Sequence, residues 1–286
     1  MTLSDTIGAA TGRPFEVASR RAVGGGDINQ AEMLTGQDGR RYFVKLNQAD
    51  RLDMFEAEAD GLAELAQAIR VPMPICSGID GSRAYLVLEH LELDDRGDAA
   101  ALGSQLAAMH RHTQPAFGWR RDNTIGATHQ PNTWTEHWVD FLRQHRLGFQ
   151  LSLAGHNGAP HRLIEQGERL LTKLDAFFSD YRPTPSLLHG DLWGGNYGYS
   201  AGAPVLFDPA VYYGDREADL AMTELFGGFP SAFYAAYSES WPLDAGYQTR
   251  KTLYNLYHIL NHFNLFGGGY AGQAERMIDR LLAQAG

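Results

Sequence analysis

The segment Leu187–Asn196, with the sequence LLHGDLWGGN, constrains the fold of this 286-residue chain more than any other part of the sequence. It lies in the second part of the chain, where apolar residues from Ala99 onward otherwise recur at helical spacing. Its glycines and polar residues predict a loop, and the apolar run Val205–Phe207 then predicts a short strand that ends at Asp208. Any fold of this chain must therefore accommodate a loop and a strand within a helical region.

The first part of the chain favours a sheet with one helix inserted. Arg41–Leu46 is rich in strand-forming residues and follows a turn at Asp38-Gly39. Residues 50–69 carry apolar side chains at spacings of three and four, which predicts a helix, and residues 84–88 form a second apolar strand.

A domain hinge is expected after this strand, at Glu89-His90-Leu91. We therefore predict an α+β chain with two lobes. Residues 1–89 form a small lobe with a sheet and one helix, and residues 90–286 form a larger, mainly helical lobe.

Composition excludes several classes of function. The formal net charge of −10 does not fit the basic surface that nucleic acids require. The single cysteine, Cys76, excludes an intramolecular disulfide framework and a multi-cysteine metal cluster. No window approaches the roughly 18 apolar residues that span a bilayer, and the N-terminus lacks the pattern of a signal peptide. We expect a cytoplasmic protein without nucleic-acid or membrane partners.

Three polar residues have the spacing that phosphoryl transfer from ATP requires. Asp191 and Asn196 lie five positions apart on one loop, which suits a carboxylate that accepts a proton and an amide that binds a metal. Asp208 follows at the end of the apolar strand, where its carboxylate suits Mg²⁺. Each residue alone is also common in turns, but together they favour a catalytic site. We assign His189 to bracing the loop.

In the first part, Lys45 is the candidate ligand for the ATP phosphates. A carboxylate on the following helix would hold its ammonium in place. Glu56 and Glu58 are two residues apart and point to different faces of the helix, so at most one faces the strand, and we choose Glu58. The alternative is that Lys45, Glu56 and Glu58 are all solvated charges on the surface.

A glycine-rich loop precedes these residues, and its candidate nucleotide-binding positions are Gly25, Gly26, Asp27, Ile28 and Asn29. Glycines there would let the backbone approach a phosphate closely. The loop matches neither G-x-G-x-x-G nor the Walker pattern, and a plain turn explains it equally well. Lys45, within reach of a hairpin, favours the phosphate-binding interpretation.

The chain resembles the fructosamine and ketosamine kinases, which are related to the aminoglycoside and choline kinases within the protein-kinase-like fold. The likeness covers most of the chain. The matching segments are 25–29, 43–45, 55–62 (FEAEADGL), 117–119, 122–123, 125–126, 130–132 with Trp134, 189–196 (HGDLWGGN), 208–210 and 213–228 (YGDREADLAMTELFGG). Trp193 and the YGDRE stretch resemble the ketosamine group in particular.

The resemblance implies an antiparallel sheet in the small lobe and transfer of the ATP γ-phosphate, with magnesium, to the third-carbon hydroxyl of ketosamines. Such substrates include fructoselysine and ribuloselysine, free or on glycated proteins, and the phosphorylated adduct then falls off. Glu89, His90 and Leu91 would bind adenine through their backbone. Some family members carry a cysteine in the glycine-rich loop that links two subunits, and this chain has none there.

The resemblance also points to substrate residues. Trp193 would offer an aromatic face to the sugar, although a buried core position is the alternative. Asp219 would brace the catalytic loop. Asp215 and Glu217 would attract the ammonium of the substrate, unless they are simply solvated.

Two other functions remain open at this point. A kinase of another small alcohol or amino sugar, such as an aminoglycoside or choline, would use the same Asp191, Asn196 and Asp208. An inactive nucleotide-binding module is a rival of a different class, but such modules usually lose one of the aspartates, and both are present.

Overall fold

The computed structural model describes residues 2–24, 28–94 and 96–286. The chain forms two compact units by its internal contacts. The first comprises Met1–Asp98 and Gly198–Asp208, and the second comprises Ala99–Tyr197 and Pro209–Gly286. The first unit therefore extends past residue 89 and also takes in a segment from the second half of the sequence.

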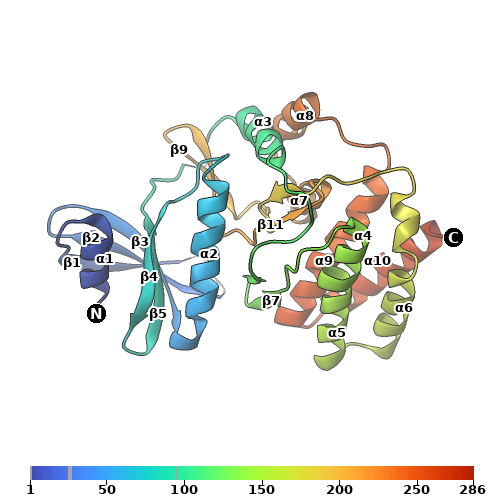
Figure 1. The fold of residues 1–286 in the computed structure, drawn as a ribbon, viewed down its shortest axis with the longest axis horizontal. Coiled ribbons are helices and arrows are strands. Elements are labelled where there is room, and N and C mark those ends of the chain that lie inside the picture. The colour runs from blue at the N-terminus through green and yellow to red at the C-terminus, as the bar shows by residue number, and fades with distance from the viewer. Residues whose placement is uncertain (1, 25–27, 95) are drawn as a thin grey trace. The chain divides into compact units, whose positions relative to one another are not determined.

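A five-stranded antiparallel sheet forms the centre of the first unit, in the strand order β1-β2-β3-β5-β4 (Figure 1). Its strands are β1 (Val17–Val23), β2 (Gln30–Gly36), β3 (Arg41–Gln48), β4 (Pro74–Asp80) and β5 (Arg83–Glu89). Gly39 adopts a φ of 81° in the turn between β2 and β3, a conformation that glycine reaches without strain. The expected strands and hairpin turn are therefore confirmed.

Two helices cover opposite faces of this sheet. The other elements of the unit are α1 (Leu3–Thr11), η1 (Ala49–Arg51), α2 (Leu52–Leu65), β9 (Tyr197–Ser200) and β10 (Ala203–Leu206). Val44 of β3 shares a buried core with Ile7 of α1, whereas the next residue, Lys45, contacts Glu58 of α2. Successive strand residues point to opposite faces, so β3 sends its lysine to the side of α2.

Helix α1 was not among the expected elements, although the sequence carries its signal. The Thr2 hydroxyl accepts a hydrogen bond from the Asp5 N–H, and the Asp5 carboxylate accepts one from the Thr2 N–H at 2.9 Å. This reciprocal capping pattern is visible as Thr-x-x-Asp before the first apolar turns. Leu3 and Ile7 then pack onto the sheet.

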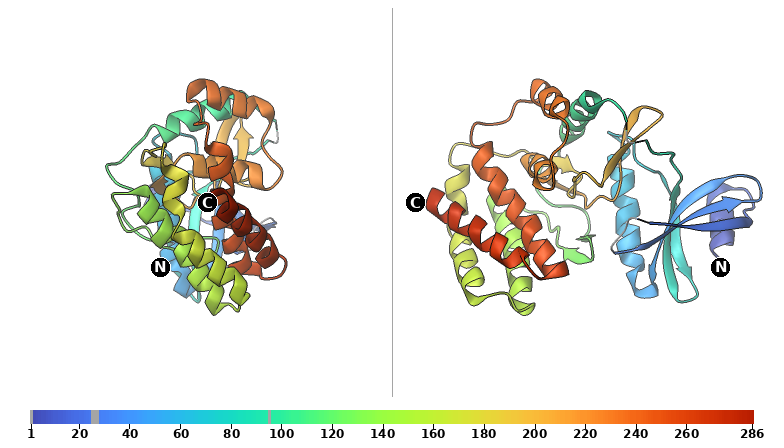
Figure 2. Two further views of the ribbon diagram at one scale, coloured as in Figure 1. Left: turned by 90° about the vertical axis from the view of Figure 1, so that its right-hand side faces the viewer. Right: turned by 180° about the vertical axis from the view of Figure 1, so that it is seen from behind.

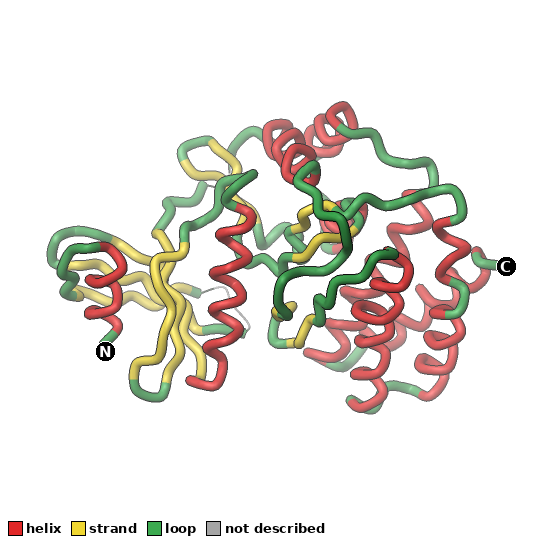
Figure 3. The backbone as a smooth tube through the Cα atoms, viewed as in Figure 1, coloured by secondary structure: helices red, strands yellow, loops and turns green. Residues whose placement is uncertain are grey.

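The second unit is mainly helical, with short strands between the helices (Figure 3). Its helical elements are α3 (Ala99–His110), α4 (Trp138–Phe141), the π-helix η2 (Leu142–Leu147), α5 (Gly148–His156), α6 (His161–Leu171), η3 (Leu174–Phe178), α7 (Glu217–Leu225), α8 (Ser231–Ser240), α9 (Tyr247–Phe266) and α10 (Tyr270–Gln284). Helices α5, α6, α9 and α10 pack together, and α3 packs against α8 (Figure 2).

Two strand pairs lie among these helices. They are β6 (Asn123–Ile125) with β7 (Thr128–Gln130), and β8 (Ser186–Leu188) with β11 (Tyr212–Gly214). Strand β8 leads directly into the loop that begins at His189. The expected α+β architecture is confirmed, and no helix in the described part of the chain is long and apolar enough to cross a membrane.

Candidate active site

Lys45 is the centre of a buried ion cluster in the first unit. Its Nζ donates to Glu58 Oε1 at 2.5 Å and to Asp208 Oδ1 at 2.6 Å, and the lysine is only 6% exposed. The structure therefore pairs Lys45 with Glu58 rather than with Glu56. It also brings Asp208 to the same ammonium, a contact that spans 163 positions in the sequence.

Burial and charge act in opposite directions on this cluster. Burial alone would lower the pKa of Lys45, but the carboxylates of Asp208 and Glu58 more than offset it and raise that pKa. Lys45 therefore stays protonated and offers a fixed positive charge. Such a charge, preorganised in a site with little water, suits the oxygens of a triphosphate.

Asp208 adopts an unusual backbone conformation. Its φ is 58°, in the left-handed region that non-glycine residues rarely occupy. The side chain is about half exposed (49%) even though one of its oxygens contacts the buried Lys45. Strained residues of this kind persist where the surrounding structure holds them and cluster at functional sites.

The end of the glycine-rich loop is tied to β3 beside Lys45. Asn47 lies two residues after Lys45 on the same face of the strand, and its Nδ2 donates to Asn29 Oδ1 at 2.7 Å and to the Ile28 carbonyl at 3.3 Å. The predicted positions Gly25, Gly26 and Asp27 lie outside the described residues. Sequence reasoning missed Asn47, although its place two residues from Lys45 was a usable signal.

The segment that the sequence predicts to be a hinge, Glu89–Leu91, starts with the last residue of β5. The Glu89 N–H donates to the Met73 carbonyl at 2.8 Å, and its carboxylate accepts from Arg70 at 2.5 Å. His90 and Leu91 follow outside the strand and are half-buried. A backbone contact to adenine from this segment would therefore come from His90 or Leu91, or from the Glu89 carbonyl, and not from the Glu89 N–H.

Asp191 and Asn196 lie side by side in the second unit, on the loop His189–Asn196, which we call the Asp191 loop. Asn196 Nδ2 donates to the Asp191 carbonyl at 2.8 Å and to Asp191 Oδ2 at 3.3 Å. The Asp191 N–H donates to His189 Nδ1 at 3.2 Å, and His189 is fully buried. The loop thus presents a carboxylate and an amide together.

Asp219 holds this loop from α7. Its carboxylate accepts from the His189 N–H at 2.7 Å and from the Gly190 N–H at 2.8 Å, and it lies 3.2 Å from His110 Nε2. Burial would raise the pKa of Asp219, but the hydrogen bond to His110 and the bonds to the loop hold it below its usual value. His110 was missed as a site residue because it lies 109 positions away and carries no local signal.

Trp193 is 41% exposed, which excludes the alternative that it is a buried residue of the core. Its backbone N–H donates to the Asp191 carbonyl at 3.1 Å, and its carbonyl accepts from the Asn196 N–H at 3.0 Å. The indole therefore belongs to the loop that carries the catalytic candidates, and part of its surface is open to a ligand.

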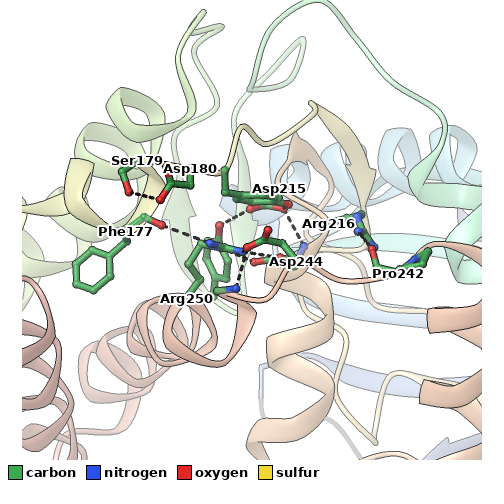
Figure 4. A network of polar contacts seen from close by, with 12 residues as sticks. Phe177, Ser179, Asp180, Asp215, Arg216, Pro242, Asp244 and Arg250 are labelled. Carbon is green, nitrogen blue, oxygen red and sulfur yellow. Dashed lines mark hydrogen bonds and ion pairs between the residues drawn. The ribbon is translucent and has the colours of Figure 1, made fainter.

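Asp215 lies in a network of polar contacts with Arg250 nearby (Figure 4). Asp215 and Glu217 are both buried and do not form an open acidic patch. Asp215 accepts from Tyr254 Oη at 2.5 Å and from Tyr181 Oη at 3.0 Å. Both oxygens of Glu217 are bound by Arg250, at 2.7 and 3.0 Å.

Neither carboxylate has any exposed surface. The expected contact with a substrate ammonium does not fit this burial, because both groups already have partners within the unit. The pKa of Glu217 is raised to about 7, chiefly because the carboxyl group is buried. The hydrogen bond to Arg250 lowers this pKa, and the nearby charge of Asp215 raises it.

Comparison with known proteins identifies the family. The fructosamine kinase family matches residues 1–284. The chain belongs to the fructosamine kinase family. A Synechocystis protein named "Probable ketoamine kinase" is 52% identical over 292 residues, with 98% of this chain and 96% of that protein covered. The chloroplastic protein-ribulosamine 3-kinase of Arabidopsis thaliana is 41% identical over 278 residues, covering 95% and 85%.

The structural comparison agrees. The crystal structure of a candidate fructosamine-3-kinase from Haemophilus somnus matches with a TM-score of 0.90 at 29% identity, and the match covers 98% of this chain and 97% of that one. The kinase-like fold and the family that the sequence resembles are therefore confirmed. Members of this family are ATP-dependent phosphotransferases with an alcohol group as acceptor.

Each of the two residues predicted to bind magnesium carries a suitable oxygen. Asp208 in the first unit has a carboxylate and Asn196 in the second has an amide, and oxygen ligands of this kind suit Mg²⁺. No group of three or more His, Cys, Asp or Glu residues that could hold a metal occurs among the described residues.

Proposed function

We propose that this protein is a ketosamine 3-kinase, which transfers the γ-phosphate of ATP to the third-carbon hydroxyl of ketosamines such as ribuloselysine and fructoselysine. In this role it acts in the deglycation of amines and proteins, because the phosphorylated adduct is unstable and leaves the amine. The names of the relatives support this substrate class: one is a probable ketoamine kinase, and another is a protein-ribulosamine 3-kinase.

The observation that carries the proposal is the pair Asp191 and Asn196 on a loop held by Asp219. In the reaction, the Asp191 carboxylate accepts the proton of the C3 hydroxyl as the hydroxyl oxygen bonds to the γ-phosphorus. The bond from that phosphorus to the bridging oxygen breaks, and ADP leaves with the electron pair. Because Asp219 fixes the loop backbone, the carboxylate is positioned before the substrate arrives.

The first unit supplies the nucleotide contacts in this proposal. Lys45, fixed by Glu58, binds phosphate oxygens. We assign further phosphate contacts to Gly25, Gly26, Asp27, Ile28 and Asn29, and adenine binding to the segment Glu89–Leu91. Asp208 and Asn196 would hold Mg²⁺, whose charge offsets that of the phosphates.

Trp193 supplies the sugar contact. A partly exposed indole on the loop that carries Asp191 offers a flat apolar face to the C–H side of a sugar and leaves the hydroxyls to polar groups. We do not extend the substrate role to Asp215 and Glu217, since their carboxylates are bound inside the second unit.

The test is ATP consumption by the purified protein with Mg²⁺ and one acceptor at a time: ribuloselysine, fructoselysine, an aminoglycoside and choline. Turnover of a ketosamine alone supports the proposal. Turnover of only the aminoglycoside or choline would keep the chemistry and overturn the substrate, and no turnover of any acceptor would favour the inactive nucleotide-binding module.

A further inference from the structure

The Trp193 indole lies against a glycine two residues further along the Asp191 loop. A Cβ atom placed on Gly195 would come within 2.4 Å of both Cη2 and Cζ2 of Trp193, and within 2.9 Å of Cε2. These three atoms belong to the six-membered ring, so the indole covers the position that any side chain at residue 195 would take. Carbon atoms in van der Waals contact are about 3.5–4.0 Å apart, so the two cannot coexist without movement.

The neighbouring glycine has open space around it apart from its own chain neighbours. A Cβ atom on Gly194 would meet no heavy atom within 4 Å outside its two chain neighbours. Neither glycine has a backbone conformation in the left-handed region, so alanine is sterically allowed by the backbone at both. A short contact with a residue beyond the chain neighbours, here the Trp193 indole, is therefore found at Gly195 and not at Gly194.

We infer that Gly195 is a positioning residue for substrate specificity. Because Gly195 has no side chain, the Trp193 indole can lie against it, and this contact holds the indole in the orientation that binds the sugar. The inference rests on the proposed function in naming the sugar. The contact with Gly195 covers one side of the indole ring. Trp193 is 41% exposed, and this exposed surface is available for the ligand.

Displacement of the indole should leave the rest of the loop in place. The loop backbone is fixed by two amide hydrogen bonds to Asp219, at 2.7 and 2.8 Å, and by the hydrogen bonds between Asn196 and Asp191. The three heavy atoms nearest to a methyl group at residue 195 all belong to the partly exposed Trp193 side chain, which moves more easily than buried backbone. The effect should therefore fall on acceptor binding and not on ATP binding.

The experiment uses Gly195→Ala, its matched control Gly194→Ala, Trp193→Ala and the double variant Trp193→Ala/Gly195→Ala. We expect Gly195→Ala to raise the KM for ribuloselysine about three- to tenfold, as expected for the loss of one aromatic contact, with the KM for ATP unchanged. Gly194→Ala should keep both wild-type values. In the double variant, Gly195→Ala should add nothing to Trp193→Ala, because the indole through which it acts is gone.

A spectroscopic measurement tests the contact between the Trp193 indole and Gly195 without any substrate. The chain has five tryptophans, and ¹⁹F NMR of the 5-fluorotryptophan-labelled protein identifies Trp193 as the resonance lost in Trp193→Phe. Gly195→Ala should shift this resonance, and Gly194→Ala should not.

An unshifted resonance in Gly195→Ala would overturn the inference, as would an equal further loss of activity in the Trp193→Ala background, which would indicate general damage to the loop. If the wild-type protein turned over no ketosamine, the proposed function would fail, yet the resonance would still decide whether Gly195 seats the indole.

Discussion

Asp191 is the residue whose replacement should separate catalysis from binding. Asp191→Asn keeps the size of the side chain but removes the carboxylate that accepts the hydroxyl proton. We expect turnover to fall by about two to four orders of magnitude, with little change in the affinity for ATP. Steady-state kinetics measures the first quantity, and calorimetric titration with ATP measures the second. Wild-type turnover in this variant would show that another group takes the proton.

Glu217 should make the stability of the protein depend on pH. Its pKa is raised from 4.5 to about 7 in the folded protein, so the folded state holds this proton more tightly than the unfolded state does. The contribution is complete below about pH 4.5, declines as the pH rises, and is lost above about pH 7. Its size is about 3 kcal/mol in the free energy of unfolding.

Urea unfolding between pH 4.5 and 7.5 tests this for the wild type and for Glu217→Gln. The variant cannot titrate at this position, so its free energy of unfolding relative to the wild type should improve by about 3 kcal/mol across that range. A constant difference between the two proteins would mean that Arg250 keeps Glu217 ionised throughout.

At the scale of elements, the turn from β8 into the Asp191 loop depends on close contact with the segment that follows Asp208. Gly190 adopts a φ of 83°, and a Cβ there would lie 2.1 Å from the Ala210 carbonyl oxygen. The N–H of the same residue, Ala210, donates a hydrogen bond to the His189 carbonyl at 2.8 Å. The two segments therefore hold each other at a distance that only glycine permits.

Gly190→Ala should lower the free energy of unfolding by about 3 kcal/mol or more, because it adds a backbone clash to the left-handed strain. Gly202 is the matched control, since its φ is 80° but a Cβ there meets nothing within 4 Å. Gly202→Ala should cost only the strain, about 1–2 kcal/mol. Equal losses in chemical denaturation would contradict the role of the Ala210 contact.

The sequence predicts interactions between residues that are near in the chain far better than those between distant residues. The pairing of Asp191 with Asn196 follows from a spacing of five, and helix geometry predicts that at most one of Glu56 and Glu58 faces Lys45, although it does not say which. The burial of Asp215 could not be predicted, because its partner Tyr254 lies 39 positions away on α9. The contact between His110 and Asp219 likewise needs the packed fold.

At the scale of the whole molecule, the first unit is assembled from two separate parts of the sequence. Residues 198–208 return to it after the Asp191 loop. The Tyr199 carbonyl accepts from the Asp94 N–H at 2.7 Å, and the Leu206 N–H donates to the Arg70 carbonyl at 3.0 Å. This segment also carries Asp208 to the buried Lys45.

A fragment of residues 1–98 should therefore be less stable than the same fragment joined by a short glycine-serine linker to residues 198–208. The linker is feasible because Asp94 and Tyr199 are hydrogen-bonded neighbours close to both cut ends. Without the added segment, Lys45 keeps Glu58 but loses one of its two carboxylates, and loss of a partner from a buried charge costs about 3 kcal/mol or more. Thermal unfolding followed by circular dichroism measures the difference.

The joined fragment with Asp208→Asn separates the contribution of the ion cluster from that of the strands. Equal stability of residues 1–98 with and without the segment would show that the first unit is complete before the chain returns to it.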